Sequence, residues 1–351
     1  MNNNRFVLVI VLVFIIQLLV GCNKNNIERY SDYTYLLGTI VKVTIYTEED
    51  KAEKYFEEIF ELISDMEQLL SKNIDSSEVS KINQESGNNK VVVSEDTLDL
   101  LLLAKEYSSL SEGKFDVTIG PLVKLWNIGD DSAKVPLKSE LEDVLPLIDY
   151  NRININKETE EVFLMDKGMI IDLGGIAKGY VADRLVDYME ENKIESGIIN
   201  LGGNIVTVGT KPDGSIWKIG LQNPIEERGK EFGVIECQDL SIVTSGIYER
   251  YLEKNGIKYH HILDPRTGYP FDNELASVTI LSKYSVDGDG LSTAVFSMGL
   301  IDGYEFVEDE EDVDAIFITK ENDVYLTNGA EEVFDLKNSE FMLKDINQYK
   351  K

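Results

Sequence analysis

The stretch that decides the fold class is Ile171-Asp172-Leu173-Gly174-Gly175-Ile176-Ala177-Lys178-Gly179-Tyr180. Residues 169–172, before the glycine pair, predict a strand, and residues 176–192 predict an amphipathic helix. Glycines at such a turn let the backbone approach a ligand, and the helix N-terminus favours anions. Lys178 stands in the first helical turn, from which its side chain can reach a phosphate. The glycine spacing is not that of the dinucleotide fingerprint, and tight packing of helix on strand explains the pair equally well.

The segments on either side of this stretch mix strands and helices. Apolar residues recur at helical spacing over residues 48–70, and Ser94 is a typical N-cap for a second helix that ends near Gly113. A further helix is predicted to start near Asp289. The sequence has neither a tandem repeat nor a low-complexity linker, so we expect one mixed α+β domain. Strands are predicted within residues 35–47, 153–165, 197–209 (broken at 202–203), 278–282 and 315–319.

The N-terminus differs from the rest of the chain. Arg5 is the only charge before an apolar run over residues 6–20, which suits a signal peptide better than a full membrane span. The run ends in Leu19-Val20-Gly21-Cys22, which resembles a bacterial lipobox; an uncleaved anchor helix is the alternative. Either way we expect the bulk of the chain outside the cytoplasm, tethered to a membrane. The predicted organisation is a signal peptide at 1–21, lipidated Cys22 and a tether at 22–33, and one domain at 34–345.

Charge and cysteine content exclude several classes of protein. The chain has 34 Lys and Arg against 64 Asp and Glu, a formal net charge of −30, and such an acidic surface repels nucleic acid. An anionic cofactor therefore needs local donors or a metal. With Cys22 lipidated, Cys237 is the one remaining thiol, which excludes an internal disulfide and a cysteine-based zinc site. The two histidines, His260 and His261, are adjacent, which excludes a histidine-rich zinc site.

A second motif is the segment Gly113-Lys114-Phe115-Asp116-Val117-Thr118-Ile119-Gly120-Pro121-Leu122-Val123-Lys124-Leu125-Trp126. Its first glycine ends a helix, and an Asp-Val-Thr turn follows before Gly-Pro. Taken alone, the segment favours a capped turn that places Trp126 in the core.

A third motif combines Thr244-Ser245-Gly246 with Tyr259-His260-His261-Ile262-Leu263-Asp264-Pro265-Arg266-Thr267-Gly268. Neighbouring residues of an extended segment point to opposite faces, so we expect one histidine to face the site and the other to face away from it. The structural alternative is a strand that runs into an Asp-Pro turn.

The fourth motif is Asp289-Gly290-Leu291-Ser292-Thr293-Ala294. If a helix begins here, Asp289 and Thr293 stand four apart on one face. Their carboxylate and hydroxyl oxygens suit magnesium or calcium. The alternative is an Asp N-cap with a threonine that faces the solvent.

Together, these four segments resemble the ApbE-type FAD:protein FMN transferases. Further matches are Leu37-Gly38-Thr39, Ser77-Glu78-Val79-Ser80-Lys81-Ile82-Asn83 and Asn200-Leu201-Gly202-Gly203-Asn204. The similarity runs from about residue 34 to about residue 330, and many relatives are also lipoproteins. The resemblance implies an ApbE-like fold, FAD as substrate and a magnesium ion.

The resemblance also assigns roles to individual residues. The flavin and ribityl regions of FAD would lie against Phe115, Asp116 and Val117. Asn73 stands where the family often has a tyrosine, so a stacking contact with a ring is lost there. His261 and Asp289 would be catalytic. The other cofactor contacts would be Leu37, Asn73, Asp172, Lys178 and, through its backbone, Leu263, while the metal ligands would be Gly175 by its carbonyl, Asp289, Ser292 and Thr293.

The reaction implied by the resemblance is attack of an acceptor threonine hydroxyl on the FMN phosphorus of FAD, with release of AMP. His261 would accept the proton, and Asp264 or Asp289 are alternatives for that role. Acceptors would be flavoproteins of extracytoplasmic or membrane redox complexes, reached by an enzyme on the outer face of the cell membrane. Two other functions remain open at this point: hydrolysis of FAD to FMN and AMP, and flavin binding without chemistry.

Overall fold

The computed structural model of the chain describes residues 27–224 and 229–349. The predicted signal peptide, Cys22 and the first part of the tether lie outside the described residues. Among the helices in these two ranges, none is both long enough and apolar enough to cross a membrane.

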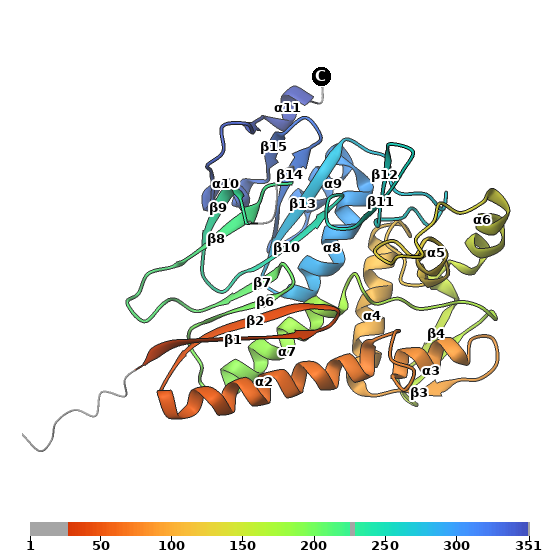
Figure 1. Cartoon of the computed structure of the whole chain (residues 1–351), viewed down its shortest axis with the longest axis horizontal. Coiled ribbons are helices and arrows are strands. Elements are labelled where there is room, and N and C mark those ends of the chain that lie inside the picture. Colours follow the sequence, from red (N-terminus) through yellow and green to blue (C-terminus); the bar gives the residue numbers. More distant parts are fainter. Residues whose placement is uncertain (1–26, 225–228, 350–351) are drawn as a thin grey trace, which may run out of the picture.

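One large sheet forms the centre of the molecule (Figure 1). All neighbouring strands in it run antiparallel, apart from the last pair. The N-terminal hairpin forms one edge and a short C-terminal strand the other. In spatial order the strands are β1 (Glu28–Leu36), β2 (Thr39–Thr47), β6 (Gly197–Leu201), β7 (Asn204–Val208), β10 (Ser241–Gly246), β13 (Leu275–Ser282), β14 (Val313–Thr319), β15 (Asp323–Leu326) and β17 (Met342–Leu343).

Helices cover one face of this sheet and a small sheet packs on the other, so each face buries its own apolar cluster. The helices are α2 (Glu49–Leu70), α3 (Glu78–Gln84), α4 (Glu95–Leu110), α5 (Gly120–Trp126), α6 (Lys138–Val144), α7 (Ala177–Glu191), α8 (Ser285–Met298), α9 (Leu300–Asp309), α10 (Asn328–Val333) and α11 (Ile346–Tyr349). The smaller sheets are β8 (Trp217–Gln222), β9 (Glu231–Cys237) and β16 (Phe334–Leu336); β3 (Val91–Val92), β5 (Glu161–Leu164) and β4 (Ile153–Asn156); and β11 (Tyr251–Lys254) with β12 (Ile257–His260).

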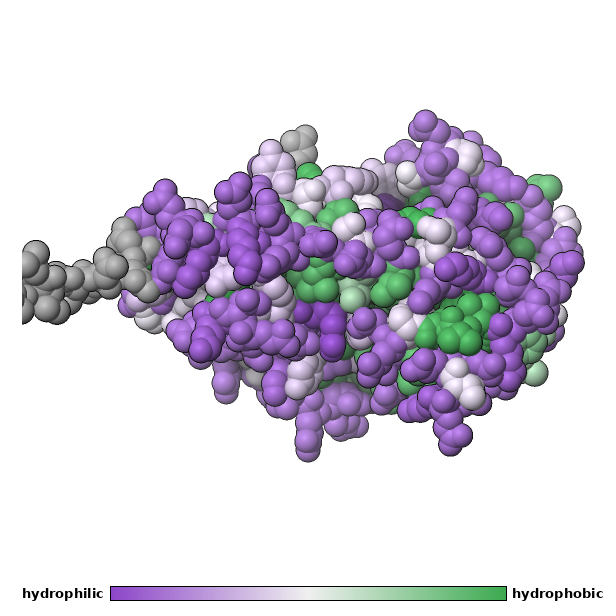
Figure 2. Space-filling model, turned by 90° about the horizontal axis from the view of Figure 1, so that it is seen from below, coloured by the Kyte–Doolittle hydropathy of each residue, from purple (hydrophilic) through white to green (hydrophobic). Residues whose placement is uncertain are grey.

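The surface agrees with the acidic composition. Seen from the side on which α2 lies, it is mainly hydrophilic, with separate apolar areas between the polar side chains (Figure 2). Cys237 is a free cysteine and is buried.

The predicted mixed α+β architecture is confirmed, with corrections to two strands. Residues 35–47 form two strands rather than one, because Leu37 and Gly38 adopt positive φ and turn the chain back into a hairpin. Residues 169–172 are extended but form only an isolated bridge, between Ile170 and Ile119. The strand prediction was wrong there because the second motif crosses this segment at a single point instead of running alongside it.

The helix predicted to start near Asp289 begins one turn earlier, at Ser285. Its first amides need acceptors, and the carboxylate of Asp183 on α7 accepts the N–H groups of Ser285 at 2.7 Å and Val286 at 2.8 Å. Asp289 is therefore not an N-cap but lies inside the helix. The cap comes from another helix, which local sequence cannot reveal.

Candidate active site

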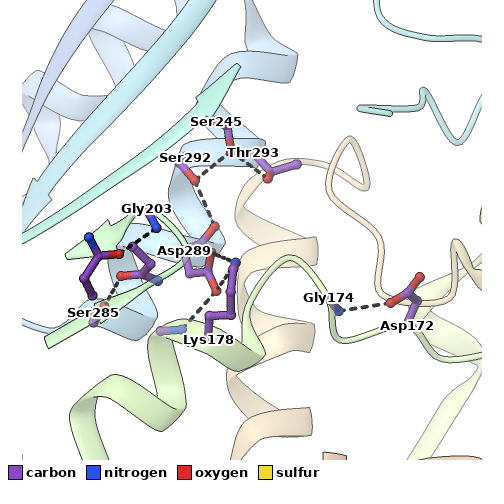
Figure 3. A network of polar contacts seen from close by, with 12 residues as sticks. Asp172, Gly174, Lys178, Gly203, Ser245, Ser285, Asp289, Ser292 and Thr293 are labelled. Carbon is purple, nitrogen blue, oxygen red and sulfur yellow. Dashed lines mark hydrogen bonds and ion pairs between the residues drawn. The ribbon is translucent and has the colours of Figure 1, made fainter. Parts of the chain in front are cut away.

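The centre of the site is the contact between the N-terminal turns of α7 and α8. Gly179 makes this contact possible, since a Cβ there would stand 2.3 Å from the carbonyl oxygen of Ser285. Asp289 is 4% exposed, and its carboxylate lies 3.1 Å from Lys178 Nζ and accepts the N–H of Gly179 at 3.0 Å (Figure 3). Lys178 lies in the first turn of α7, as predicted, and forms an ion pair with Asp289.

Three hydroxyl groups lie beside this ion pair. Ser245 Oγ, at the end of β10, is 2.9 Å from Ser292 Oγ and 3.2 Å from Thr293 Oγ1 (Figure 3). Gly175 approaches the same group, because a Cβ on it would lie 3.9 Å from Thr293 Oγ1. The structure therefore gathers the four predicted metal ligands, Gly175, Asp289, Ser292 and Thr293, and adds Ser245.

The donor set decides which metals fit. Within the described residues no group of three or more His, Cys, Asp or Glu side chains could hold a metal by itself. One carboxylate surrounded by neutral oxygens fits magnesium, which keeps several waters and takes substrate phosphates as ligands. The cluster thus fits a magnesium ion shared with a phosphate-bearing substrate.

Asp172 lies in the loop before α7. Its carboxylate accepts the N–H of Gly174 at 3.0 Å and pairs with Lys72 Nζ at 2.6 Å. Asn73, the next residue in the loop after α2, is exposed, and its backbone N–H donates to Ser71 Oγ at 3.3 Å. The backbone N–H of Asp172 donates to the carbonyl of Val117 at 2.8 Å, which attaches the second motif to the first.

Within the second motif, three neighbours occupy different environments. Phe115 is buried beside the glycine pair, since a Cβ on Gly175 would stand 3.2 Å from its ring. Val117 is fully packed in the core. Asp116 is 6% exposed, and its carboxylate accepts hydrogen bonds from the N–H and hydroxyl of Thr118 and from the N–H of Tyr150. Burial raises the pKa of Asp116, and these donors oppose that rise.

The two adjacent histidines have different partners, as an extended segment predicts. His260 is buried, and its Nε2 lies 2.9 Å from the carbonyl of Phe271. His261 places Nδ1 3.2 Å from the carbonyl of Arg250. Burial lowers the pKa of His261 to about 4, and the positive charges of Arg250 and Lys178 add to this effect. His261 is therefore neutral at pH 7, and because a carbonyl only accepts, the proton sits on Nδ1 and Nε2 is a free base.

The Asp-Pro-Arg-Thr-Gly turn is anchored from several sides. Trp126 donates its indole N–H to the carbonyl of Gly268 at 2.7 Å, and Leu263 packs with it in a small apolar cluster. Asp264 accepts hydrogen bonds from Arg266 N at 2.8 Å and Thr267 Oγ1 at 3.0 Å. Because both oxygens of Asp264 serve this turn, the geometry favours His261 over Asp264 as the base.

Leu37 lies in the hairpin turn between β1 and β2. Two hydrogen bonds link this hairpin to α8 through the turn between β6 and β7. The N–H of Gly202 donates to the carbonyl of Ile40 at 3.1 Å. Two residues later, Asn204 Oδ1 accepts the hydroxyl of Ser285 at 2.8 Å, one helical turn before Asp289 (Figure 3). The hairpin turn therefore stands at the rim of the site.

Comparison with known proteins shows which family this chain belongs to. The sequence profile described as the ApbE family matches residues 37–317. The chain belongs to the ApbE family. A Klebsiella pneumoniae protein named FAD:protein FMN transferase is 40% identical over 306 residues, which cover 87% of this chain and 93% of that protein. A Treponema pallidum protein of the same name is 33% identical, covering 92% and 93% of the two chains.

Solved ApbE structures confirm the predicted fold. The ApbE protein of Thermotoga maritima superposes with a TM-score of 0.81 at 30% identity, covering 87% of this chain and 99% of that one. The flavin transferase ApbE of Vibrio cholerae gives 0.79 at 28% identity, covering 88% and 99%. The family inferred from four short motifs is thus the right one.

Sequence reasoning missed several residues of this ApbE site. Lys72 carried no signal beyond its place next to Asn73, and Ser245 was part of a noted motif without a role. Asp183 lies on the polar side of α7, where an aspartate is ordinary, and only the packing of α7 against α8 gives it a function. All three act across the fold, at sequence separations that no local pattern covers.

Proposed function

We propose that the chain transfers FMN from FAD to a threonine of an acceptor protein and releases AMP. The observation that carries this proposal is the meeting of Lys178, Asp289 and the hydroxyl cluster in an ApbE-family chain. A lysine and a set of oxygen ligands at one point suit the pyrophosphate of FAD, whose charge an acidic protein must offset locally. The relatives named FAD:protein FMN transferase favour transfer over hydrolysis or storage of FAD.

A magnesium ion would be held by Asp289, Ser292, Thr293 and the carbonyl of Gly175, with Ser245 alongside. Bound there, the ion supplies Lewis-acid polarisation of the phosphate oxygens. Because Lys178 contacts Asp289 at 3.1 Å, it would either share that carboxylate with the ion or turn towards a phosphate. In either position its charge opposes the negative charge that develops on the transferred group.

The remaining predicted contacts divide between positioning FAD and moving the proton. Phe115, Val117 and the backbone of Leu263 would shape the flavin pocket, with Asp116 holding its turn. Three predicted contacts would reach FAD from the loops around the site: Asp172, Leu37 and Asn73. They are among the least enclosed residues of the site. Asp172 and Leu37 are half-buried and Asn73 is exposed.

The proposed chemistry exchanges one phosphorus–oxygen bond for another. The threonine oxygen attacks the FMN phosphorus, the anhydride bond breaks, and AMP leaves with its phosphate. The hydroxyl proton passes to His261 Nε2, whose lone pair is free because Nδ1 donates to Arg250. His260 also has a ring nitrogen without a partner, but it is buried and bonded to the Phe271 carbonyl, whereas the pKa of His261 is affected by the charge of Lys178.

We propose that the enzyme works on the outer face of a cell membrane, attached through lipid on Cys22. The support is the apolar run and lipobox-like sequence of the N-terminus. Its acceptors would be flavoproteins of extracytoplasmic or membrane redox complexes. Labelled palmitate in the wild type but not in Cys22→Ala would test the attachment, and label in both would contradict it.

The function is tested by mixing the soluble form, starting at Asn23, with FAD, magnesium and a flavoprotein acceptor. Intact-mass spectrometry is expected to show an FMN-sized increase on the acceptor, with AMP release, and both should vanish with chelator. AMP and free FMN without a modified acceptor would favour the hydrolase. FAD that stays intact with every acceptor would favour a flavin-binding protein and remove the catalytic roles of His261 and Asp289.

A further inference from the structure

The outer face of the β1–β2 hairpin exposes large side chains where an enzyme surface is ordinarily polar. Tyr33, Tyr35 and Ile40 are 72%, 70% and 62% exposed. Tyr33 is the direct cross-strand partner of Lys42, and Tyr35 of Ile40, so the four side chains share one face of the hairpin. We call these four residues the hairpin face.

The sheet pattern shows that this exposure is not a packing accident. On β2, Val41 and Val43 alternate with the residues of the hairpin face and are completely buried against the helices. The strand therefore already has its core side, and the opposite side carries two tyrosines and an isoleucine that the fold itself does not use. Exposed aromatic and apolar side chains that gather together are typical of interaction sites.

The hairpin face borders the proposed active site. Ile40 is hydrogen-bonded through its carbonyl to Gly202, and the Gly202–Gly203 turn leads directly into Asn204 and its bond with Ser285 of α8. Figure 3 shows Gly203 and Ser285, and Ser285 begins the helix that carries Asp289. An acceptor bound to the hairpin face would therefore lie next to the turn that connects the sheet to α8.

The hairpin strands carry two cations, Arg29 and Lys42, on the same face as Tyr33, and two carboxylates, Glu28 and Asp32, on the other face. Lys42 and Arg29 are exposed, and neither forms an ion pair among the described residues. Both line a pocket of about 230 Å³ on the same side of the sheet, together with Lys218, which pairs with Glu236. In a protein of net charge −30, such a cluster attracts a partner that carries carboxylates.

We propose that the hairpin face is the docking surface for the acceptor protein, which contacts it through apolar side chains flanked by carboxylates. This inference rests on the proposed FMN transfer and names the surface that selects its macromolecular substrate. Tyr33 and Tyr35 supply rigid contact area with little loss of side-chain entropy, and Lys42 steers the acidic partner. None of the four residues of the hairpin face is among the proposed FAD contacts, so a change there should leave FAD binding intact.

The test compares Tyr33→Ser/Tyr35→Ser with Met342→Ser/Leu343→Ser, a matched pair of exposed residues on β17 at the opposite edge of the sheet. The probe is an extracytoplasmic flavoprotein domain that the wild type modifies on a threonine. The tyrosine variant is expected to raise the acceptor KM about tenfold or more while kcat and the KM for FAD stay unchanged. The β17 variant is expected to match the wild type in all three constants.

Lys42→Glu provides an independent measurement, because it changes charge without removing a tyrosine. Its acceptor kcat/KM should fall, and the dependence of that constant on salt should weaken. Thermal unfolding of each variant checks that the fold is intact. A wild type that modifies no acceptor would defeat the proposed function itself.

If the wild type transfers FMN and the tyrosine variant keeps the same acceptor KM, the docking proposal is wrong. It is also wrong if the variant loses only self-association in light scattering, or only binding to anionic vesicles, with acceptor KM unchanged. In those cases the hairpin face serves a second copy or a membrane.

Discussion

The two sides of the active site each hold a carboxylate with a lysine, but they are built differently. On the helix side, Asp289 lies inside α8 with a side chain that is 6% exposed, and its partners Lys178 and Gly179 lie in the first turn of α7. On the loop side, Asp172 is 12% exposed and pairs with Lys72 from the loop after α2. A carboxylate fixed by two packed helices has fewer alternatives than one held between loops, so we expect the larger effects on the helix side.

The largest effect is expected from Asp289→Asn. The substitution keeps size but removes the only carboxylate of the oxygen cluster, so FMN transfer should fall about 10²- to 10³-fold. Rates of AMP release at several magnesium concentrations would measure the loss. Asp287→Asn is the matched control on the same helix, because Asp287 contacts the Tyr107 hydroxyl instead of Lys178. Equal losses in both variants would mean that the damage comes from α8 packing and not from the site.

His261→Gln should lower the transfer rate about 100-fold, the smaller end of the range for general-base catalysis. Glutamine retains a donor for the Arg250 carbonyl but has no basic nitrogen. His260→Gln serves as the comparison, since His260 bonds to Phe271 and packs edge-on against Phe296. If the His261→Gln enzyme kept the wild-type rate, His261 would not be the base, and Asp289 or a group of the acceptor would have that role.

The pH profile tests the environment of His261 without a substitution. Its pKa is lowered from an ordinary 6.5 to about 4, chiefly by burial, so its basic form persists well below neutrality. As the pH falls from 8 to 5.5, the transfer rate should therefore not decrease with the apparent pKa near 6.5 that an ordinary histidine would give. A fall of the rate through pH 6.5 that disappears in His261→Gln would show that the ring is more solvated than the structure indicates.

Asp183 connects the helix side to protein stability. Burial raises its pKa from 3.8 to about 6, and the negative charges of Asp287 and Asp187 contribute. Because the folded-state pKa lies above the unfolded one, the stabilisation belongs to the protonated form and is lost as pH rises through about 6. Relative to Asp183→Asn, the wild-type free energy of unfolding should drop by about 1–3 kcal/mol between pH 4 and pH 7.

The matched control for that measurement is Asp187→Asn, four residues along the same helix, where the side chain is 55% exposed and pairs with Arg184. Urea unfolding at several pH values gives both curves. If the wild-type and Asp183→Asn curves run parallel, Asp183 titrates normally, and the cap of α8 contributes no pH dependence.

The same contrast explains what the sequence alone could predict. On the helix side, Asp289 and Thr293 stand four residues apart, so they were predicted together on one helix, and Lys178 was predicted in the first turn of another. On the loop side, no periodicity relates Lys72 to Asp172, a hundred residues away, and the segment before α7 was misread as a strand. Asp183 was missed for a third reason: a cap supplied by another helix leaves no mark near the amides that it satisfies.

The smallest effect is expected on the loop side, from Lys72→Ala. The lysine is 24% exposed, so its pair with Asp172 contributes about 0.2–1 kcal/mol, as partly solvated pairs do. Fluorescence titration with FAD should show a dissociation constant raised about two- to fivefold, and Lys72→Arg should restore it. Lys90→Ala, which breaks the distant surface pair with Glu161, should leave FAD binding unchanged. A loss of about 30-fold or more in Lys72→Ala would remove the distinction between the two sides, because a loop lysine would then contribute as much to binding as groups fixed between helices.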